Sequence, residues 1–320
     1  MLLSAIVNPD TFAEKNFDPA GHYSDNILLF LRGIHTNGVI VGDAHGTLTR
    51  KMREQYDLSP SSKRDPEIKV RFEELFNPNA QFKRVMDCIN CPGPTVEIST
   101  EELIQIADTA SKADAVLGPT ELQHYVRCRF EKRRDDYSQF KGSLHQVLDE
   151  RIEDIIVRSV RFSNWLRFNE SQLATKPKPN ETFEAKCARF YEGFSYILDL
   201  WAGHGVRFRH GPSEVAIITA VSRYTSLEEI RRFENEIREF VCDPLQKKFK
   251  VPVNLSLKRD EHGVVHYRCL QTESVVLAFD RGFDLFCKGK KRRFKANNVN
   301  LGDIKRCREY QDLPSAYTRW

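Results

Sequence analysis

The chain has 320 residues, of which 29% are charged and 40% hydrophobic, and its formal net charge is +4 at pH 7. Its length favours two domains, and it is long enough to bury a core without the metal or disulfide staples that small proteins need. No stretch approaches the roughly 18 consecutive apolar residues of a transmembrane helix. The net charge is too small to indicate a polyanionic partner by itself.

The 8 cysteines predict free thiols rather than disulfides. Several lie inside apolar helix or strand patterns, and the N-terminal sequence lacks the basic region of a signal peptide. Cys88 and Cys91 form a lone C-x-x-C pair before a Pro-Gly-Pro turn, whereas a zinc site would need a second pair at similar spacing. We therefore expect a reduced, cytoplasmic protein.

The first half of the sequence alternates short apolar strands with amphipathic helices. This βα alternation predicts a parallel sheet in a domain over residues 1–135. The charged, weakly apolar stretch 131–142 marks the expected domain boundary. The predicted strands are 2–7, 39–43 and 113–119, and the predicted helices are 23–38, 47–56, 99–112 and 120–134, with a further helical stretch ending near residue 91.

The second half, residues 142–320, also predicts an α/β domain, with a basic segment near its C-terminus. Its long helix 183–205 has an aromatic inner face that includes Phe190, Phe194 and Trp201. A polar loop, 169–182, precedes this helix. The other predicted helices are 143–152 and 225–241, and the predicted strands are 155–160, 214–221, 251–257, 264–272 and 274–279.

A group of polar residues stands out in the two apolar strands near the C-terminus. An H-x-R motif at His266 and Arg268 is followed by Thr272 and by an R-G-x-D-x-F pattern from Arg281 to Phe286. This pattern resembles the C-terminal domain of MIT-domain-containing proteins and its prokaryotic relatives, which has a phospholipase D-like fold. The preceding order of elements is similar too, so the resemblance covers about residues 142–311.

The resemblance implies a site at His266, Arg268 and Glu273, which take the places of the histidine, lysine and aspartate of the phospholipase D signature. In such a site an imidazole attacks phosphorus, a cation stabilises the anionic oxygens, and a carboxylate orients the histidine. Residues two apart on a strand share a face, so His266 and Arg268 are expected to reach one phosphate. Arginine keeps the charge of lysine but is not a neutral replacement for it.

The chain departs from the family in two respects. The first strand of the relatives tends to carry an acidic residue, whereas the strand predicted here has Arg158, Ser159 and Arg161. The superfamily pairs two signatures, and this chain has one, so activity would require a homodimer. The MIT-associated relatives are instead thought to be non-catalytic and to bind phospholipid head groups.

A basic segment follows the motif and could bind several phosphates. Such a segment favours nucleic acid, with salt-dependent affinity, but an anionic membrane surface is also compatible with it. An ordinary solvated loop is the alternative. The candidate phosphate-binding residues are Arg281, Lys290, Lys291, Arg292, Arg293 and Lys295.

In the first half, Asp10 and Asp43 close two predicted strands, and Asp114 begins a third. Carboxylates gathered at the end of a parallel sheet hold Mg²⁺ or Mn²⁺ in PIN-like nucleases, and the segment from Ile6 to Phe12 loosely resembles the opening of such a domain. Aspartate is also common at helix caps, which is the simpler interpretation.

Two functional hypotheses follow. The first is a cytoplasmic nuclease or phosphodiesterase that acts on nucleic acid, with a prokaryotic antiviral defence system as a candidate setting. Its phospholipase D-like site would need no cofactor, and only the PIN-like half would need Mg²⁺ or Mn²⁺. The second is a non-catalytic module that binds phosphate on nucleic acid or anionic lipid, while the N-terminal half docks a partner protein.

Overall fold

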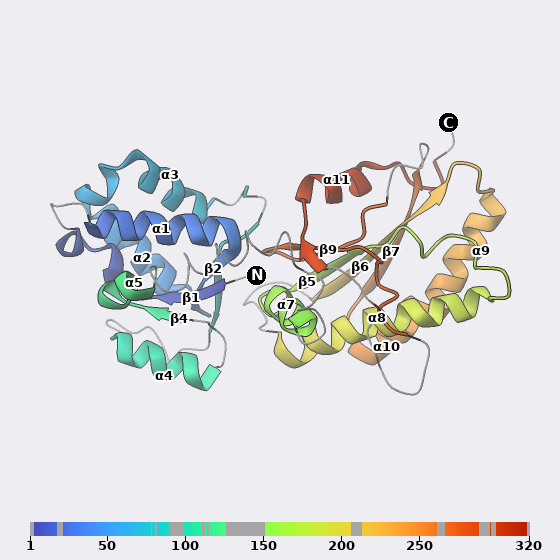
Figure 1. The fold of residues 1–320 in the computed structure, drawn as a ribbon, viewed down its shortest axis with the longest axis horizontal. Coiled ribbons are helices and arrows are strands. Elements are labelled where there is room, and N and C mark those ends of the chain that lie inside the picture. The colour runs from blue at the N-terminus through green and yellow to red at the C-terminus, as the bar shows by residue number, and fades with distance from the viewer. Residues whose placement is uncertain are drawn as a thin grey trace. The chain divides into compact units, whose positions relative to one another are not determined.

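The computed structural model describes residues 3–17, 22–77, 79–80, 82–89, 99–110, 113, 115–125, 151–205, 213–260, 266–287, 295 and 299–318. The described residues up to Tyr125 belong to one compact unit and those from Arg151 onward to a second. Both units combine helices with a sheet, so the chain is of the mixed α/β class (Figure 1). The boundary expected between residues 131 and 142 lies outside the described residues.

The first unit contains a four-stranded parallel sheet in the order β3-β2-β1-β4. Its strands carry almost continuous apolar residues because both faces of the sheet are covered. Three of the four strands fall where the sequence predicts them. The prediction was wrong at β3, whose segment we expected to be helical. The strands are β1 (Leu3–Val7), β2 (Gly38–Asp43), β3 (Val85–Ile89) and β4 (Ala115–Leu117).

Helices lie on both sides of this sheet, with α1 and α4 on opposite sides in Figure 1. An aromatic cluster of Phe12, Tyr56 and Phe72 helps to fill the core, and the stacked rings of Tyr56 and Phe72 have centroids 3.7 Å apart. The helices are α1 (His22–Asn37), α2 (Thr47–Asp57), α3 (Pro66–Leu75), α4 (Thr100–Ala110) and α5 (Pro119–Tyr125).

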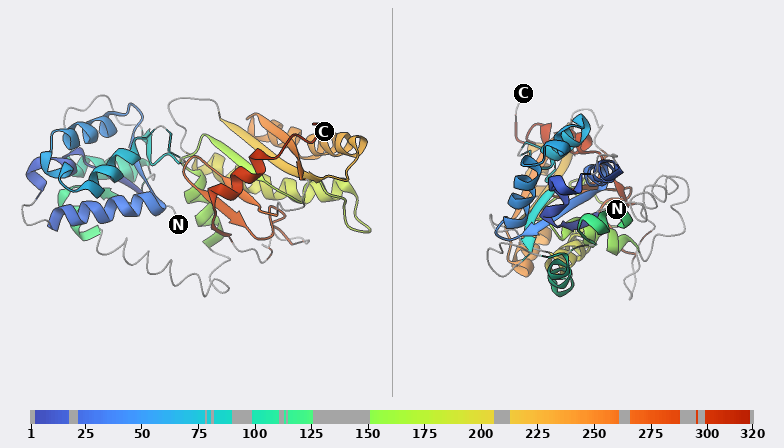
Figure 2. Two further views of the ribbon diagram at one scale, coloured as in Figure 1. Left: turned by 90° about the horizontal axis from the view of Figure 1, so that it is seen from above. Right: turned by 90° about the vertical axis from the view of Figure 1, so that its left-hand side faces the viewer.

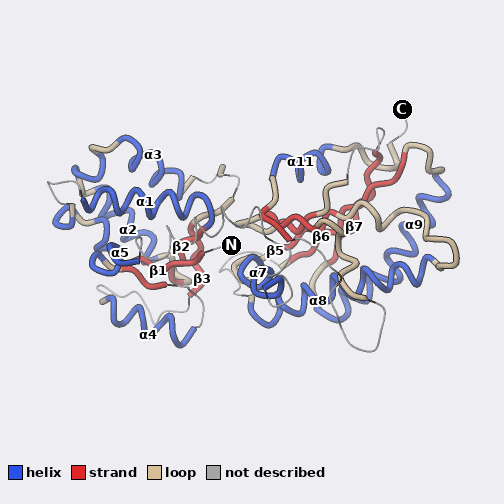
Figure 3. The backbone as a smooth tube through the Cα atoms, viewed as in Figure 1, coloured by secondary structure: helices blue, strands red, loops and turns tan. Residues whose placement is uncertain are grey.

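The second unit contains a mixed six-stranded sheet in the order β10-β9-β8-β5-β6-β7. The strands β5, β6 and β7 are parallel, whereas β8 pairs antiparallel with β5, β9 with β8, and β10 with β9. Figure 3 draws the strands of both sheets in red. The strands are β5 (Trp165–Asn169), β6 (Glu214–Ser222), β7 (Val253–Asp260), β8 (Cys269–Gln271), β9 (Val276–Phe279) and β10 (Val299–Leu301).

The helices of the second unit cover both faces of its sheet. The predicted inner face of α8 is buried, including Phe190, Phe194 and Trp201. On the opposite face, Tyr310 of α11 packs against Ile218 of β6, and Figure 2 draws α11 in front of the strands. The helices are α7 (Arg151–Val160), α8 (Phe183–His204), α9 (Leu227–Ile237), α10 (Asp243–Phe249) and α11 (Ile304–Asp312).

The first strand of the second unit was predicted in the wrong place. Residues 155–160 belong to α7, where Ile152, Ile156 and Val160 recur every four residues and are buried. Asp154 and Arg158 form an i,i+4 ion pair on the same helix. Helical spacing of the buried residues therefore overrides the β-branched composition that favours a strand. The actual strand is β5, which ends directly before Glu170.

Six of the cysteines lie in the described ranges, and all six are free thiols. The thiols of Cys269 and Cys307 are hydrogen-bonded to each other at 2.7 Å between β8 and α11. Cys91, the second member of the C-x-x-C pair, falls outside the described ranges. Within those ranges, none of the helices combines the length and apolar character required to cross a bilayer.

Candidate functional site

A pocket in the second unit opens at the carboxyl ends of three parallel strands. Ser171 follows β5, Ser222 ends β6 and Asp260 ends β7, and all three residues line a cavity of about 480 Å³. Ligands of open α/β sheets commonly bind beyond the carboxyl ends of their parallel strands. The topology alone therefore makes this pocket the leading candidate site.

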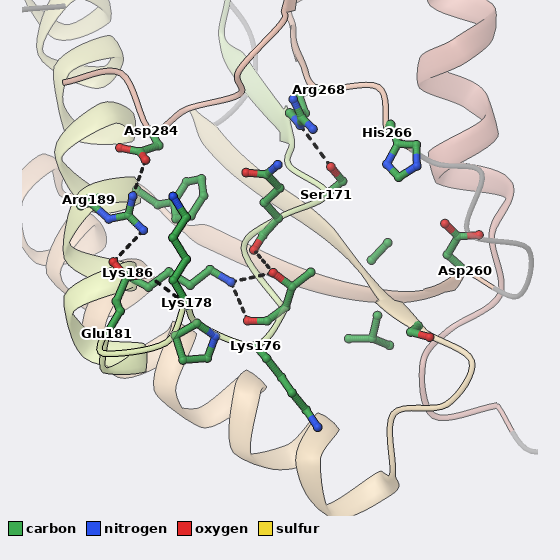
Figure 4. Close-up of a pocket in the computed structure, with 17 residues that line it drawn as sticks. Ser171, Lys176, Lys178, Glu181, Lys186, Arg189, Asp260, His266, Arg268 and Asp284 are labelled. Atoms are coloured by element: carbon green, nitrogen blue, oxygen red, sulfur yellow. Dashed lines mark hydrogen bonds and ion pairs between the residues drawn. The ribbon is translucent and has the colours of Figure 1, made fainter. Parts of the chain in front are cut away.

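Two further segments complete the pocket walls (Figure 4). His266 and Arg268 enter from the segment before β8, and Lys186 and Arg189 come from the first turns of α8. We predicted His266 and Arg268 on a strand, but β8 begins only at Cys269. The two side chains nevertheless line the same cavity.

Arg268 is held in place by short contacts from several directions. Its Nε donates to Ser171 Oγ at 3.2 Å, and its Nη1 donates to the carbonyl of Asp280. Its nearest carboxylate is Glu170, with 3.9 Å between Arg268 Nε and Glu170 Oε1. The guanidinium is therefore fixed mainly by neutral oxygen atoms, and its positive charge is only partly compensated.

Glu170 lies completely buried behind Arg268. Its two carboxyl oxygens accept the backbone N–H groups of Gln172 at 2.9 Å and of Phe283 at 2.8 Å. Burial nevertheless raises the pKa of Glu170 to about 7, against the opposing effect of these hydrogen bonds and of Arg268. Near neutral pH this carboxyl is therefore partly protonated, which further weakens its neutralisation of Arg268.

Lys186 is a buried cation, only 5% exposed. Its Nζ donates to the backbone carbonyl of Thr175 at 2.5 Å and to Thr175 Oγ1 at 2.8 Å. Among the residues that the structure describes, it has no ion pair. Burial lowers the pKa of Lys186 to about 8, because loss of water disfavours the charged form.

On the other side of the pocket, the charges compensate one another. Arg189 pairs with Glu181 at 2.8 Å and with Asp284 at 2.5 Å, and Asp284 also pairs with Lys295 at 2.5 Å. Figure 4 shows Arg189, Glu181 and Asp284 on the opposite side of the cavity from His266 and Asp260. It fixes the geometry of the wall but leaves little charge for a ligand.

The lining as a whole is cationic. With His266 neutral, the five basic and three acidic side chains give the lining a formal charge of +2. Apart from the network around Arg189, the cations of the lining are Lys176, which pairs with Glu229 at 3.2 Å, and Lys178, Lys186 and Arg268. Of these, Lys186 and Arg268 are the two whose side chains are not exposed. The ionisable lining residues are Lys176, Lys178, Lys186, Arg189, Arg268, His266, Glu181, Asp260 and Asp284.

The structure does not bring Glu273 to this pocket. Glu273 is buried beyond the far end of β8, where its Oε1 accepts the backbone N–H of Asn164 at 3.1 Å. The role predicted for it beside His266 is therefore wrong, because the length of β8 separates the two residues. Asp260, which lines the pocket with His266, is the carboxylate on that side.

The other predicted phosphate-binding residues are only partly placed. Arg281 is exposed and is not part of the pocket lining, whereas Lys295 reaches the pocket wall through Asp284. The remaining four, Lys290, Lys291, Arg292 and Arg293, lie outside the described residues.

The R-G-x-D-x-F pattern has a structural explanation. Gly282 has a φ of +66°, and a Cβ there would lie 2.1 Å from Glu170 Oε2. Phe283 is buried against Phe168 with ring centroids 5.1 Å apart. Asp284 pairs with Arg189 of α8. The pattern thus attaches the turn after β9 to the back of the pocket.

The acidic residues predicted for a metal site in the first unit have other contacts. Asp43 is buried and accepts the backbone N–H groups of Leu48 at 2.7 Å and His45 at 3.2 Å, as a helix cap does. Asp10 pairs with Lys15 at 3.2 Å. Asp114 lies outside the described residues. Within the described ranges, no group of three or more His, Cys, Asp or Glu side chains is placed to hold a metal ion.

Sequence reasoning missed Lys186 and Glu170. Lys186 stands between Phe183 and Phe190 on the inner side of an otherwise apolar helix face, and a lysine at such a position is the signal that could have found it. Glu170 directly follows β5, so correct placement of that strand would have revealed an acidic residue at its end.

No protein-family model matches the chain, and no significant match is found among curated proteins. The phospholipase D-like and PIN-like resemblances therefore stay predictions drawn from the sequence. For this reason we base the function on the geometry and charge of the pocket.

Proposed function

We propose that the second unit binds a phosphate ester in this pocket, with Lys186, Arg268 and His266 facing the phosphoryl oxygens. The observation that carries the proposal is Lys186, a buried ammonium without an ion pair among the described residues. A buried ammonium that has only neutral hydrogen-bond partners, with Glu170 and Glu181 acting on it from a distance, is costly, and an anionic ligand would reduce that cost. On this proposal, Lys186 lowers the stability of the fold but contributes to ligand binding.

The surroundings favour a phosphoryl group over a single carboxylate. Ser171 and the Asp280 carbonyl use two of the five N–H donors of Arg268, so the others can donate to phosphoryl oxygens, while Lys186 supplies a point charge from another wall. The hydroxyl of Ser171 lies in the same lining. Such a convergence of donors suits an anion with several oxygens, and nucleic acid is the source that the sequence analysis favours.

The test is a comparison of two lysine variants by calorimetric titration with pyrophosphate. We expect Lys186→Met to weaken binding by about tenfold or more, because it removes a charge-assisted hydrogen bond. Lys247→Met should leave affinity within about twofold, because Lys247 is exposed on α10 and does not line this pocket. Equal losses in the two variants, or no binding by the unmodified protein, would contradict the proposal.

Phosphodiester hydrolysis is the second candidate function, and it rests on His266. This side chain is exposed in the cavity that Arg268 also lines. In this mechanism an imidazole nitrogen forms a bond to phosphorus, the alkoxide leaves and takes a proton, and water then cleaves the P–N bond. Arg268 would stabilise the charge on the oxygens, and a second copy of the chain would supply the proton donor.

Hydrolysis can be separated from binding by His266→Asn. We expect this variant to lose turnover of bis(p-nitrophenyl) phosphate while keeping more affinity for pyrophosphate than Lys186→Met keeps. If the unmodified protein binds pyrophosphate but releases no nitrophenol, the pocket is a binding site alone. Turnover that persists in the variant would exclude His266 as the nucleophile.

A further inference from the structure

The turn that follows β6 carries an exposed aromatic residue close in the chain to the pocket lining. Tyr224 is 78% exposed, more than any other large apolar side chain in the described ranges. A single exposed tyrosine is unremarkable on its own. The position of this one is informative, because Ser222, two residues earlier, lines the cavity.

Hydrogen bonds connect the turn directly to the cavity wall. The backbone N–H of Tyr224 donates to Ser222 Oγ at 3.3 Å, and that of Thr225 donates to the Ser222 carbonyl at 3.0 Å. Ser222 is also in register with Asp260, the last residue of β7 and another lining residue. The turn that carries Tyr224 therefore begins at the strand ends of β6 and β7 that form this wall of the cavity.

Side-chain hydrogen bonds from Arg259 of β7 also hold the turn in place. Arg259, next to Asp260, donates from Nη1 to the carbonyl of Arg223 at 3.2 Å and from Nη2 to the carbonyl of Ala316 at 2.9 Å. The guanidinium of Arg223 lies 4.6 Å from the centroid of the Tyr224 ring and donates to its hydroxyl. A ring held in this way loses little conformational freedom when a planar ligand stacks on it.

We propose that Tyr224 is a stacking platform for the nucleobase of the ligand whose phosphate occupies the pocket. The substrate class is then a nucleotide or the end of a single-stranded nucleic acid. Every base has a π-face that stacks on an exposed aromatic ring, and nearby arginine adds cation–π attraction. A lipid head group has no such ring. This inference rests on the proposed phosphate binding and adds a second subsite to it.

The experiment compares ligands with and without a base on the full-length protein. Adenosine monophosphate, ribose phosphate, pyrophosphate and a short phosphorylated oligonucleotide are titrated against the unmodified protein, Tyr224→Ala and Tyr224→Trp. We expect Tyr224→Ala to weaken both base-containing ligands by about tenfold and to leave the other two within about twofold. Tyr224→Trp should retain or increase affinity for the base-containing ligands.

The possible results separate the two levels of the proposal. If ribose phosphate binds as tightly as adenosine monophosphate, the base subsite is refuted while phosphate binding stands. If neither pyrophosphate nor ribose phosphate binds, the phosphate site itself fails. Binding of only the mononucleotide or only the oligonucleotide identifies the source of the base. Preferential binding to phosphatidic acid vesicles, unaffected by Tyr224→Ala, would overturn the inference in favour of a membrane surface.

Because Tyr224 is exposed, its variants should fold. Circular dichroism and the urea midpoint check this, since both should match those of the unmodified protein. Tyr317→Ala is the matched control, because Tyr317 is a second exposed tyrosine of the same unit and, unlike Tyr224, has no pocket-lining residue within two positions of it in the chain. Equal effects of Tyr224→Ala and Tyr317→Ala on nucleotide affinity would also refute the proposal.

Discussion

At the scale of single residues, the pocket depends on side chains whose environments conflict with their charges. Glu170 is buried beside Arg268 with a pKa raised to about 7, and Lys186 is buried with a pKa lowered to about 8. Burial disfavours the charged form of each side chain, so each lowers the free energy of unfolding near neutral pH. Such perturbed groups in a cleft are typical of functional sites. Gly282 matters for a different reason, since it lets the backbone approach Glu170 closely.

The first prediction concerns Gly282. A Cβ at this position would lie 2.1 Å from Glu170 Oε2 and 2.8 Å from Arg268 Cδ, and the φ of +66° disfavours any L-residue with a side chain. We expect Gly282→Ala to lower the free energy of unfolding of the second unit by about 2–4 kcal/mol. Urea unfolding followed by tryptophan fluorescence measures this, because all three tryptophans lie at or after Trp165.

Gly203→Ala provides the control for that change. Gly203 lies in the last turn of α8, and nothing stands within 4 Å of a Cβ placed there. Alanine favours a helix over glycine by up to about 1 kcal/mol, so this variant should be neutral or slightly stabilised. A similar loss in both variants would show that the close approach at Gly282 is not the cause.

The second prediction concerns pH. A carboxyl whose pKa is raised on folding keeps a proton that the unfolded chain has already released, so its contribution to stability falls as pH rises from about 4.5 to about 7. The fall amounts to about 3 kcal/mol for Glu170. Glu170→Gln has no proton to lose there, although it sacrifices a hydrogen bond to a backbone N–H.

The stability difference between the two proteins should therefore change with pH. The unmodified protein is expected to be the more stable one at the acid end, and its advantage should shrink or reverse by the time pH passes 7. Urea unfolding at a series of pH values provides the measurement. A difference that stays constant across the series would mean that Glu170 ionises normally in the folded state.

At the scale of elements, the ends of the parallel strands decide what each acidic residue does. Asp43 ends β2 and caps the start of α2, whereas Asp260 ends β7 and lines the pocket. The sequence places both at strand ends but does not distinguish a cap from a ligand-facing group.

The segment 155–160 shows a second limit of local patterns. Its residues are rich in β-branched side chains yet form α7, because burial recurs at helical spacing.

The third prediction tests the role of Asp43. We expect Asp43→Ala to lower the free energy of unfolding of the first unit by about 1–2 kcal/mol, because two backbone N–H groups lose their acceptor. Asp10→Ala should cost less than about 0.5 kcal/mol, since the pair with Lys15 is exposed. Urea unfolding followed by circular dichroism reports on both.

The same variants test the magnesium or manganese site proposed from the sequence. If Asp43 acts as a cap and Asp10 as part of a surface ion pair, the shift in melting temperature caused by Mn²⁺ should be the same in both variants and in the unmodified protein. Stabilisation of the unmodified protein by Mn²⁺ that is lost in both Asp43→Ala and Asp10→Ala would establish a shared metal site instead.

At the scale of the whole molecule, the chain has two compact units, and the described walls of the pocket come from the second alone. A single chain therefore places Lys186, Arg268 and His266 in one cavity. Hydrolysis by a phospholipase D-like mechanism would still need a second histidine from another copy. Binding and catalysis thus make different demands on the oligomeric state.

The fourth prediction follows from this difference. We expect one pyrophosphate to bind per chain, with an affinity that does not depend on protein concentration. Any hydrolysis should increase with the fraction of dimer. Calorimetric titration combined with light scattering over a range of concentrations measures both quantities. A stoichiometry of one ligand per two chains would show that the binding site itself is shared.

The sequence by itself determined the α/β class and most of the strands, because these depend on local periodicity. It also singled out His266 and Arg268, but it placed them on a strand, and only the tertiary structure shows that they line one cavity. Only the tertiary structure excluded Glu273 and brought in Lys186, Glu170 and Asp260. These residues come from segments far apart in the chain. Their burial and electrostatic environment are set by several elements that pack together, and no local sequence pattern contains that information.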